Sequence, residues 1–385
     1  MKNVFILLLL GTASLFCIAC SGENSVLTDG DAVLLQPGVH AGATLASTRS
    51  MINDVGTGAD RISTIGIYLA AADGSLYPGS NAGGATFTKA PSGTNWTSTP
   101  STYVSLAQAT VYAWAPAATA LKSDGGSGSG GNSGSGSGSS SSTVLPALPV
   151  SVPAGQTFDG GNTYDCSTTD YLYGSGSATV GSATAVTANS LSASPTLYLQ
   201  HALSQVVFRI QNANDRTPDP TYDYVRQIKL TAAGGATPFY CTTASGSGSA
   251  GTMSLTDGAL SGLAAVGEIS FTPSARPQQV GTSGPVTVAY GLVAPKTGAA
   301  SGTQVTLTLT LGEQSSDATE RDLTLSTDAF NPAWQKGYRY VYTLTLGERG
   351  ISLQRQTAAI ALRNGKLFPA AWRSAAIRLP CQQTM

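Results

Sequence analysis

Few residues of this chain have the types and spacing that catalysis needs. The sequence holds only two histidines, His40 and His201, so a Ser-His-Asp or Cys-His site would depend on one of them. His201 lies on a strand-like run without a signalled nucleophile, which favours a structural histidine. Asp165 and Asp170 have the residue type of a glycosidase pair, but loop carboxylates are normally solvated. We therefore expect no enzymatic activity.

The composition excludes further functional classes. Charged residues make up 11% of the chain against about 25% in a typical protein, and the net charge is -1, so nucleic acid meets no basic surface. The Gly-rich run at 123–142 lacks the Lys-Ser or Lys-Thr ending of a phosphate-binding loop. Beyond the N-terminus the cysteines are Cys166, Cys241 and Cys381; their spacing fits no metal site, and their pairing stays open. We expect no metal, cofactor or nucleic-acid partner.

The N-terminus predicts an exported, lipid-anchored protein. Lys2 precedes an apolar run at 4–10, which is far shorter than the roughly 20 residues of a membrane span, and small residues follow up to Cys20. The segment 17–20, Cys-Ile-Ala-Cys, resembles the lipobox of bacterial lipoproteins, in which the last cysteine carries the lipid. An ordinary signal peptide with an incidental cysteine is the alternative. We expect residues 1–19 to be removed and Cys20 to be lipidated.

Short half-buried strands would build the body of the molecule. Residues 305–311 read Val-Thr-Leu-Thr-Leu-Thr-Leu, which places the apolar residues on one face and the threonines on the other. The same period of two recurs at 65–69 and at 338–346, and the long 3.6-residue periodicity of helices is missing. Repeated strands of this kind are typical of antiparallel β-sandwiches, so we predict an all-β fold.

The chain is long enough for two domains of ordinary size. We expect a tether and first strand at 20–49, an N-terminal sandwich at 50–190 and a C-terminal sandwich at 191–385. The stretch 123–142 is almost entirely Gly and Ser, so we interpret it as a flexible loop inserted in the first sandwich, with a reach of about 25 Å. The small-residue stretch at 185–195 is the predicted boundary.

A series of motifs follows one another along most of the chain. The most specific is Leu-Tyr-Leu-Gln-His-Ala-Leu-Ser at 197–204. The others are Cys20, Thr48-Arg49-Ser50, Asp60-Arg61-Ile62, Trp96, the aromatic-Pro strand end at 111–116, Asp-Tyr-Leu-Tyr at 170–173 and Trp-Gln-Lys-Gly-Tyr at 334–338. In this order they resemble the fimbrillin family, the Mfa-like and FimA-like pilins of Bacteroides-type bacteria. The resemblance implies two transthyretin-like antiparallel β-sandwich domains in tandem, in a subunit of a cell-surface fimbrium.

The resemblance also implies assembly by donor-strand exchange. A lipoprotein precursor anchored in the outer membrane is cut by a trypsin-like, Arg-specific protease, its first strand leaves, and a strand of another subunit fills the groove. Arg49 best matches the cleavage position and Arg61 is second; an ordinary solvated arginine is the other interpretation of Arg49. Val33, Leu34 and Leu35 are the clearest apolar cluster of the removable strand. The implied partners are other fimbrial subunits and the protease, with a host or bacterial surface ligand left open.

The C-terminal tail departs from the family pattern. Residues 350–385 carry five Lys or Arg side chains and two prolines in place of a regular apolar-alternating strand. A subunit that accepts a strand but cannot donate one would lie at a fimbrial tip as an adhesin. A divergent tail without a special role is equally compatible with the sequence.

A second functional class stays open, that of a monomeric surface lipoprotein that binds glycans. Sugar-binding faces stack a ring on exposed aromatic side chains. Trp96, Trp114 and Tyr173 are the residues that would form such a platform.

Overall fold

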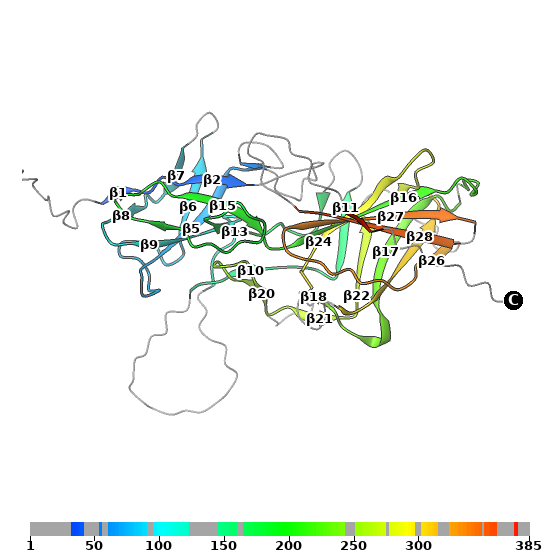
Figure 1. The fold of residues 1–385 in the computed structure, drawn as a ribbon. Helices are drawn as coiled ribbons and strands as arrows, with labels where there is room; N and C mark the ends of the chain where they lie inside the picture. Colours follow the sequence, from blue (N-terminus) through cyan, green and yellow to red (C-terminus); the bar gives the residue numbers. More distant parts are fainter. Residues whose placement is uncertain are drawn as a thin grey trace, which may run out of the picture.

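The computed structural model shows an elongated all-β molecule, with the N-terminal strands at one end and the C-terminal strands at the other (Figure 1). It describes residues 32–41, 54–55, 61–90, 95–122, 145–159, 165–219, 221–242, 251–274, 277–296, 302–314, 323–348, 350–359 and 373–375. Within these ranges no helix is long and apolar enough to cross a membrane. A short 3₁₀ turn, η1 (Ala233–Gly235), lies between strands of the C-terminal part.

Alternation of apolar and polar residues produces the central strands. In β25 (Val305–Gly312) the four apolar side chains at alternate positions are buried, whereas the threonines between them are half-buried. In β27 (Tyr338–Gly347) Tyr340, Tyr342, Leu344 and Leu346 are likewise buried. The predicted strands at 305–311 and 338–346 are therefore confirmed, and so is the all-β fold.

The C-terminal strands form two sheets that pack face to face. One sheet has the order β12-β11-β22-β17-β25-β26, with β23 also paired to β17, and the other has the order β24-β16-β27-β28-β29. Their further bounds are β11 (Gly155–Asp159), β12 (Asp165–Cys166), β16 (Ser204–Asn212), β17 (Tyr224–Ala232), β22 (Glu268–Pro273), β23 (Gln278–Gln279), β24 (Val286–Val293), β26 (Leu323–Ser326), β28 (Gly350–Ala359) and β29 (Arg373–Ala375). One apolar cluster fills the space between the sheets; Phe208 stacks on Tyr342 and packs against Phe271 there.

The N-terminal strands form one eight-stranded sheet in the order β2-β15-β13-β9-β5-β6-β7, with β14 also paired to β9. The bounds are β2 (Gly38–Ala41), β5 (Thr64–Ala70), β6 (Ala85–Lys89), β7 (Trp96–Thr99), β9 (Ala109–Ala115), β13 (Leu172–Ser175), β14 (Thr187–Ala188) and β15 (Thr196–His201). Two small pairs accompany it, β1 (Val33–Leu34) with β8 (Tyr103–Val104) and β3 (Asp54–Val55) with β4 (Arg61–Ile62). Apolar clusters cover both faces of its central strand β9, because Val111 and Trp114 belong to different clusters.

Strands from distant parts of the sequence meet where the two ends join. β10 (Leu148–Val150) pairs with β19 (Gly251–Met253), which pairs with β20 (Leu260–Ser261), while β18 (Phe239–Cys241) pairs with β21 (Ala264–Val266). β11 runs parallel to β22. β10 and β11 thus pair with strands of the C-terminal part, although they precede the predicted boundary.

Strand pairing divides the chain differently from the predicted boundary at 185–195. β15, which follows that stretch, still belongs to the N-terminal sheet, whereas β11 and β12, which precede it, belong to a C-terminal sheet. The second C-terminal sheet begins with β16 at Ser204. Pairing decides membership of a sheet, and the small residues at 185–195 only mark a connection. The number of independent domains and the limits 20–49, 50–190 and 191–385 stay predictions. The Gly/Ser stretch at 123–142 lies outside the described residues.

The sheets are mixed rather than purely antiparallel. Most neighbouring strands are antiparallel, but β2 runs parallel to β15, β11 to β22, and β16 to β27. Parallel neighbours need a connection that crosses over, and each of these three pairs joins segments more than a hundred residues apart. The short pair β3 and β4 is parallel as well. Period-two alternation gives the face of a strand but not the direction of its neighbour.

Candidate strand-exchange groove

The N-terminal segment 32–41 lies as an extended chain along the edge of the N-terminal sheet. Its first strand, β1, pairs with β8 through Val33 opposite Val104. The backbone N–H of Leu35 then donates to Thr102 over 2.9 Å, and the N–H of Gln36 donates to Ala193 over 2.9 Å. The segment therefore continues the sheet beyond β15 and holds its place by main-chain hydrogen bonds.

β2 completes this edge by pairing in parallel with β15. Val39 lies opposite Leu197, and the N–H of Gly38 donates to the Pro195 carbonyl over 2.9 Å. The exposed ring of His40 stacks on Tyr198 with 5.3 Å between ring centroids. His40 thus makes a packing contact on the outer side of the sheet edge.

Side chains of the segment enter the core at alternate positions. Leu35 is 1% exposed and Val39 is 5% exposed, Pro37 between them is buried, and Gln36 and His40 face outward. Leu35 and Val39 belong to the same apolar cluster as Val104, Leu197 and Leu199. A chain of this period fills an apolar groove while its backbone bonds to the edge strand, which is the geometry of β-strand addition.

The sequence analysis found the segment, but it identified only some of the side chains that the segment buries. Among the predicted residues Leu35 is buried and Leu34 half-buried, but Val33 is 42% exposed. The sequence analysis missed Pro37 and Val39, although a period of two from Leu35 would have found them. Whether this segment is removable remains a prediction.

Of the predicted lipidation and cleavage sites, the structure describes only Arg61. Cys20 and Arg49 lie outside the described residues, as does Cys381. Arg61 is the first residue of β4, whose backbone pairs with β3, and its neighbour Ile62 is buried. Proteases prefer exposed loops to paired strands, so the pairing of β4 makes Arg61 a poor substrate.

The three aromatic residues considered for glycan stacking are buried. Trp96 and Trp114 are each 2% exposed and Tyr173 is fully buried. The indole N–H of Trp114 donates to the Thr119 carbonyl, and the hydroxyl of Tyr173 donates to the Ser182 carbonyl. These side chains cannot form an exposed platform for a sugar ring.

Of the residues considered for catalysis, the structure brings His201 and Asp170 together and places Asp165 in another sheet. His201 and Asp170 form a buried pair in which Nδ1 lies 3.0 Å from Oδ2. Asp165 lies in β12, where its backbone pairs with Asp159 in the C-terminal sheet. The described residues contain no group of three side chains suited to hold a metal ion. Burial raises the pKa of the Cys241 thiol to about 12, so this cysteine is a poor nucleophile at neutral pH.

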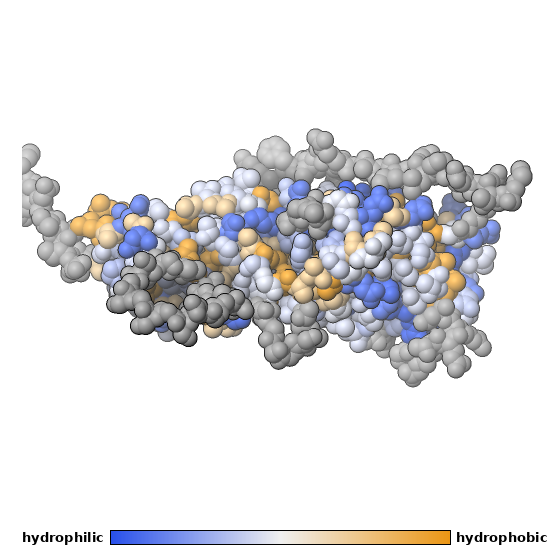
Figure 2. Space-filling model, turned by 90° about the horizontal axis from the view of Figure 1, so that it is seen from below, coloured by the Kyte–Doolittle hydropathy of each residue, from blue (hydrophilic) through white to orange (hydrophobic). Residues whose placement is uncertain are grey.

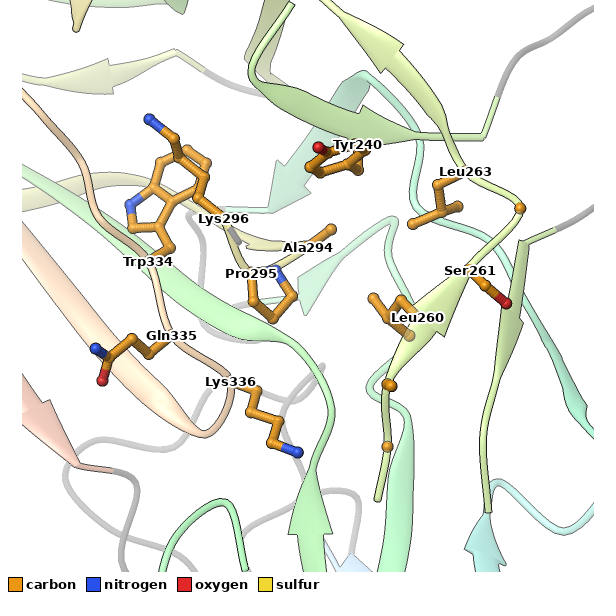
Figure 3. A pocket seen from close by; sticks show the side chains of 13 residues that line it. Tyr240, Leu260, Ser261, Leu263, Ala294, Pro295, Lys296, Trp334, Gln335 and Lys336 are labelled. Carbon is orange, nitrogen blue, oxygen red and sulfur yellow. The ribbon is translucent and has the colours of Figure 1, made fainter. Parts of the chain in front are cut away.

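A separate pocket of about 580 Å³ opens where the C-terminal part meets the β19–β20 hairpin (Figure 3). Leu260, Leu263 and Pro295 line it together with Tyr240 and Trp334. In Figure 3 the ammonium groups of Lys296 and Lys336 point in different directions and do not converge on the space between the apolar side chains. The pocket can take up an apolar group, but it lacks the converging polar groups that select a particular ligand.

Comparison with known proteins decides the family. A model of the fimbrillin-like family matches residues 48–361, which is most of the chain. The chain belongs to the fimbrillin-like family. The resemblance drawn from the motifs is thereby confirmed. Membership implies contacts with other fimbrial subunits and a place at the cell surface. No curated protein matches this fimbrillin-like chain.

Solved structures similar to this fimbrillin-like protein come from Bacteroides species. A fimbrial protein from Bacteroides vulgatus is 13% identical with a TM-score of 0.48, and the match covers 85% of this chain and 100% of that one. A candidate cell adhesion protein from Bacteroides uniformis is 14% identical with a TM-score of 0.45, and the match covers 87% of this chain and 99% of that one. A candidate polysaccharide-binding protein from Bacteroides thetaiotaomicron is 12% identical with a TM-score of 0.39, over 86% of this chain and 98% of that one.

Proposed function

We propose that this chain is a fimbrial subunit or tip adhesin, made as a lipoprotein precursor and assembled by protease-triggered donor-strand exchange. The family supports a role in a fimbrium. The observation that carries the assembly mode is the segment 32–41, which fills an apolar groove at the sheet edge upstream of Arg49. Loss of residues 20–49 would remove both β1 and β2.

Departure of this segment would create a strong acceptor site. β15 would become an edge strand with an unpaired row of backbone groups, which is a template for another strand. Val104, Leu197 and Leu199 would lose the side chains of Leu35 and Val39 that cover them. An incoming strand with apolar residues at alternate positions restores both the hydrogen bonds and the apolar burial.

The donor role of this chain's own tail stays open. Residues 350–359 form β28, which pairs along its whole length with β27 and is a resident strand of the C-terminal sheet. β29 pairs with β28. A donor strand would have to come from beyond Ala359, and a chain without one accepts a strand only, as expected of a tip adhesin.

The test is to treat the full-length protein with an Arg-specific protease while following its N-terminal sequence and its polymer size. We expect cleavage after Arg49, release of residues 20–49 and growth of oligomers. The Arg49→Ala variant should stay monomeric, whereas Arg61→Ala should behave as the wild type. A protein that loses residues 20–49 and neither polymerises nor binds a synthetic peptide of residues 32–41 would contradict the proposal.

A further inference from the structure

An unpaired strand edge borders the pocket of about 580 Å³. β20 ends the three-stranded sheet β10-β19-β20, and in the described part of the chain no strand pairs with its outer side. Residues 258–263, which include β20, form one wall of the pocket, and residues 294–296 and 334–336 lie on the other side. In Figure 3 the side chains of Leu260 and Pro295 face each other across the space. We name this feature the hairpin groove.

The hairpin groove lies on the side of the molecule that Figure 1 shows below, where β20 and β21 are labelled. Figure 2 views the molecule from that side and shows hydrophobic residues at the surface in its middle part. The strand-exchange groove belongs to another sheet, beside β15. The hairpin groove is therefore a separate site.

Hydrogen bonding in the β19–β20 hairpin shows which backbone groups face the hairpin groove. The N–H of Ser254 donates to the Ala259 carbonyl over 2.9 Å, which makes these two residues a hydrogen-bonded pair. Bonded and non-bonded pairs alternate along an antiparallel ladder, so the next pair, Met253 with Leu260, is non-bonded. The N–H and carbonyl of Leu260 thus point away from β19 and can bind the backbone of an added strand.

Contacts within the protein hold the walls of the hairpin groove in place. Gly258, in the turn of the hairpin, lies against the Tyr173 ring, because a Cβ at this position would come within 2.2 Å of it. On the other wall the N–H of Lys296 donates to the Trp334 carbonyl over 3.0 Å. A groove that is formed before binding loses less conformational freedom when a partner arrives.

The charged residues that line the hairpin groove are two lysines. The ammonium of Lys336 donates to the Asp257 carbonyl; burial lowers its pKa, and the nearby Asp257 carboxylate offsets part of that shift. Lys296 is 5% exposed, its ammonium donates to the Thr303 carbonyl over 2.9 Å, and no carboxylate of the described residues forms an ion pair with it. A buried cation without an anion is unfavourable, so a carboxylate brought by a ligand would stabilise this wall.

We propose that the hairpin groove binds an extended peptide segment of a partner protein, which adds to β20, places a large apolar side chain in the pocket and brings an acidic side chain to Lys296. In such strand addition the main-chain hydrogen bonds give affinity and the pocket gives specificity. β20 thus supplies the polar groups that the pocket itself lacks. The ammonium of Lys296 lies beside the apolar space in Figure 3, so the acidic residue flanks the apolar one in the bound segment.

The test is binding of a fluorescent peptide, Thr-Glu-Thr-Phe-Thr-Glu-Thr, to the uncleaved full-length protein, followed by fluorescence anisotropy. Its phenylalanine and two glutamates share one face of a strand, so either direction of pairing brings a glutamate to the side of Lys296. The strand-exchange groove does not compete, because residues 32–41 fill it in the uncleaved protein. We expect saturable binding that weakens at least about tenfold when alanine replaces the phenylalanine.

Protein variants locate the bound peptide. Lys296→Met should weaken binding of the glutamate peptide about tenfold, yet bind a peptide with glutamine in place of glutamate as the wild type does. Lys229→Met is the matched control, since Lys229 pairs with Glu268 in another sheet, and it should change neither. Leu260→Pro should weaken binding of both peptides more than Leu260→Ala does, because proline also removes the N–H that faces the groove.

The remaining outcomes count against the inference. Absence of binding, or binding that neither alanine in the peptide nor Lys296→Met weakens, would overturn it. Equal binding by Leu260→Pro and Leu260→Ala would exclude pairing with β20. Binding of a fluorescent fatty acid in place of the peptide would assign the pocket to small amphiphilic molecules instead. None of these results depends on cleavage at Arg49, so failure of strand exchange and failure of this inference are separate results.

Discussion

Nδ1 of His201 lies 3.0 Å from Oδ2 of Asp170, and both side chains are almost fully buried. Asp170 precedes β13 and His201 ends β15, two strands that pair with each other, and the N–H of Ala202 donates to the Tyr171 carbonyl. β16, which belongs to a C-terminal sheet, begins at Ser204, three residues after His201. The pair therefore fixes the point at which the chain passes from the N-terminal sheet to the C-terminal ones.

Asp170→Ala should lower the free energy of unfolding by about 1–3 kcal/mol, because it removes the carboxylate to which the buried His201 ring is hydrogen-bonded. Urea unfolding followed by tryptophan fluorescence measures the change. Asp73→Ala is the matched control, since Asp73 is exposed and accepts hydrogen bonds from Ser75 within a turn. If the free energy of unfolding falls no more than in the control, the His201–Asp170 pair does not stabilise the point where the chain passes between the sheets.

Leu35→Ala should destabilise the intact protein by about 2–5 kcal/mol, since Leu35 is 1% exposed within the apolar cluster. Gln36→Ala, at the exposed neighbouring position, should change little. After cleavage behind Arg49 the wild type and Leu35→Ala should unfold alike, because the segment that carries the difference is gone. A loss in the intact protein no larger than that of Gln36→Ala would show that Leu35 is not what fills the groove.

The sequence predicts best where a strand has one face in a core. β25 meets this condition, so its Val-Thr-Leu-Thr pattern gave both the strand and its buried residues. β9 does not, because one cluster covers Val111 and another covers Trp114. An aromatic residue on the second face then looks like a surface residue in the sequence, which is why Trp114 and Tyr173 entered the glycan hypothesis.

The groove could likewise be predicted from the sequence only in part. Apolar residues before Arg49 could be recognised as a strand, and alternation could have extended that strand to Val39. Its parallel pairing with β15 joins residues about 160 positions apart, and local pattern carries no information on such a partner.

Lys296 should make stability depend on alkaline pH. The residue is 5% exposed, its ammonium donates to the Thr303 carbonyl, and burial lowers its pKa from 10.5 to about 8. Between these values the unfolded chain binds the proton and the folded one does not, so this group makes the folded state more stable as pH rises from about 8 to 10.5. Below about pH 8 the buried ammonium is charged in the folded state, so its burial lowers the free energy of unfolding by the full amount.

The Lys296→Met variant tests this dependence. Its free energy of unfolding, measured at several pH values, should lack the rising contribution of Lys296, so the difference between variant and wild type should shrink with pH. Because other lysines and tyrosines titrate in the same range, only that difference is informative. A difference that stays constant from pH 7.5 to 10.5 would show that Lys296 is charged in the fold throughout.

The indole of Trp114 occupies the space above two glycines. A Cβ at Gly66 would lie 2.1 Å from the indole ring, and one at Gly84 would lie 2.5 Å from it. Gly66 faces Trp114 across β5 and β9, so Gly66→Ala must displace either the ring or a strand. We expect a loss of about 1–3 kcal/mol, the usual cost of overpacking.

Gly83→Ala is the matched control, because its Cβ would meet only the Asn81 side chain at an ordinary 3.5 Å. Combining Gly66→Ala with Trp114→Leu should cost less than the sum of the two single changes, since the smaller side chain relieves the clash. Additive costs in chemical unfolding would show that the two residues do not compete for one space. Non-additive costs would place the Trp114 ring inside the sheet in solution, where no sugar can stack on it.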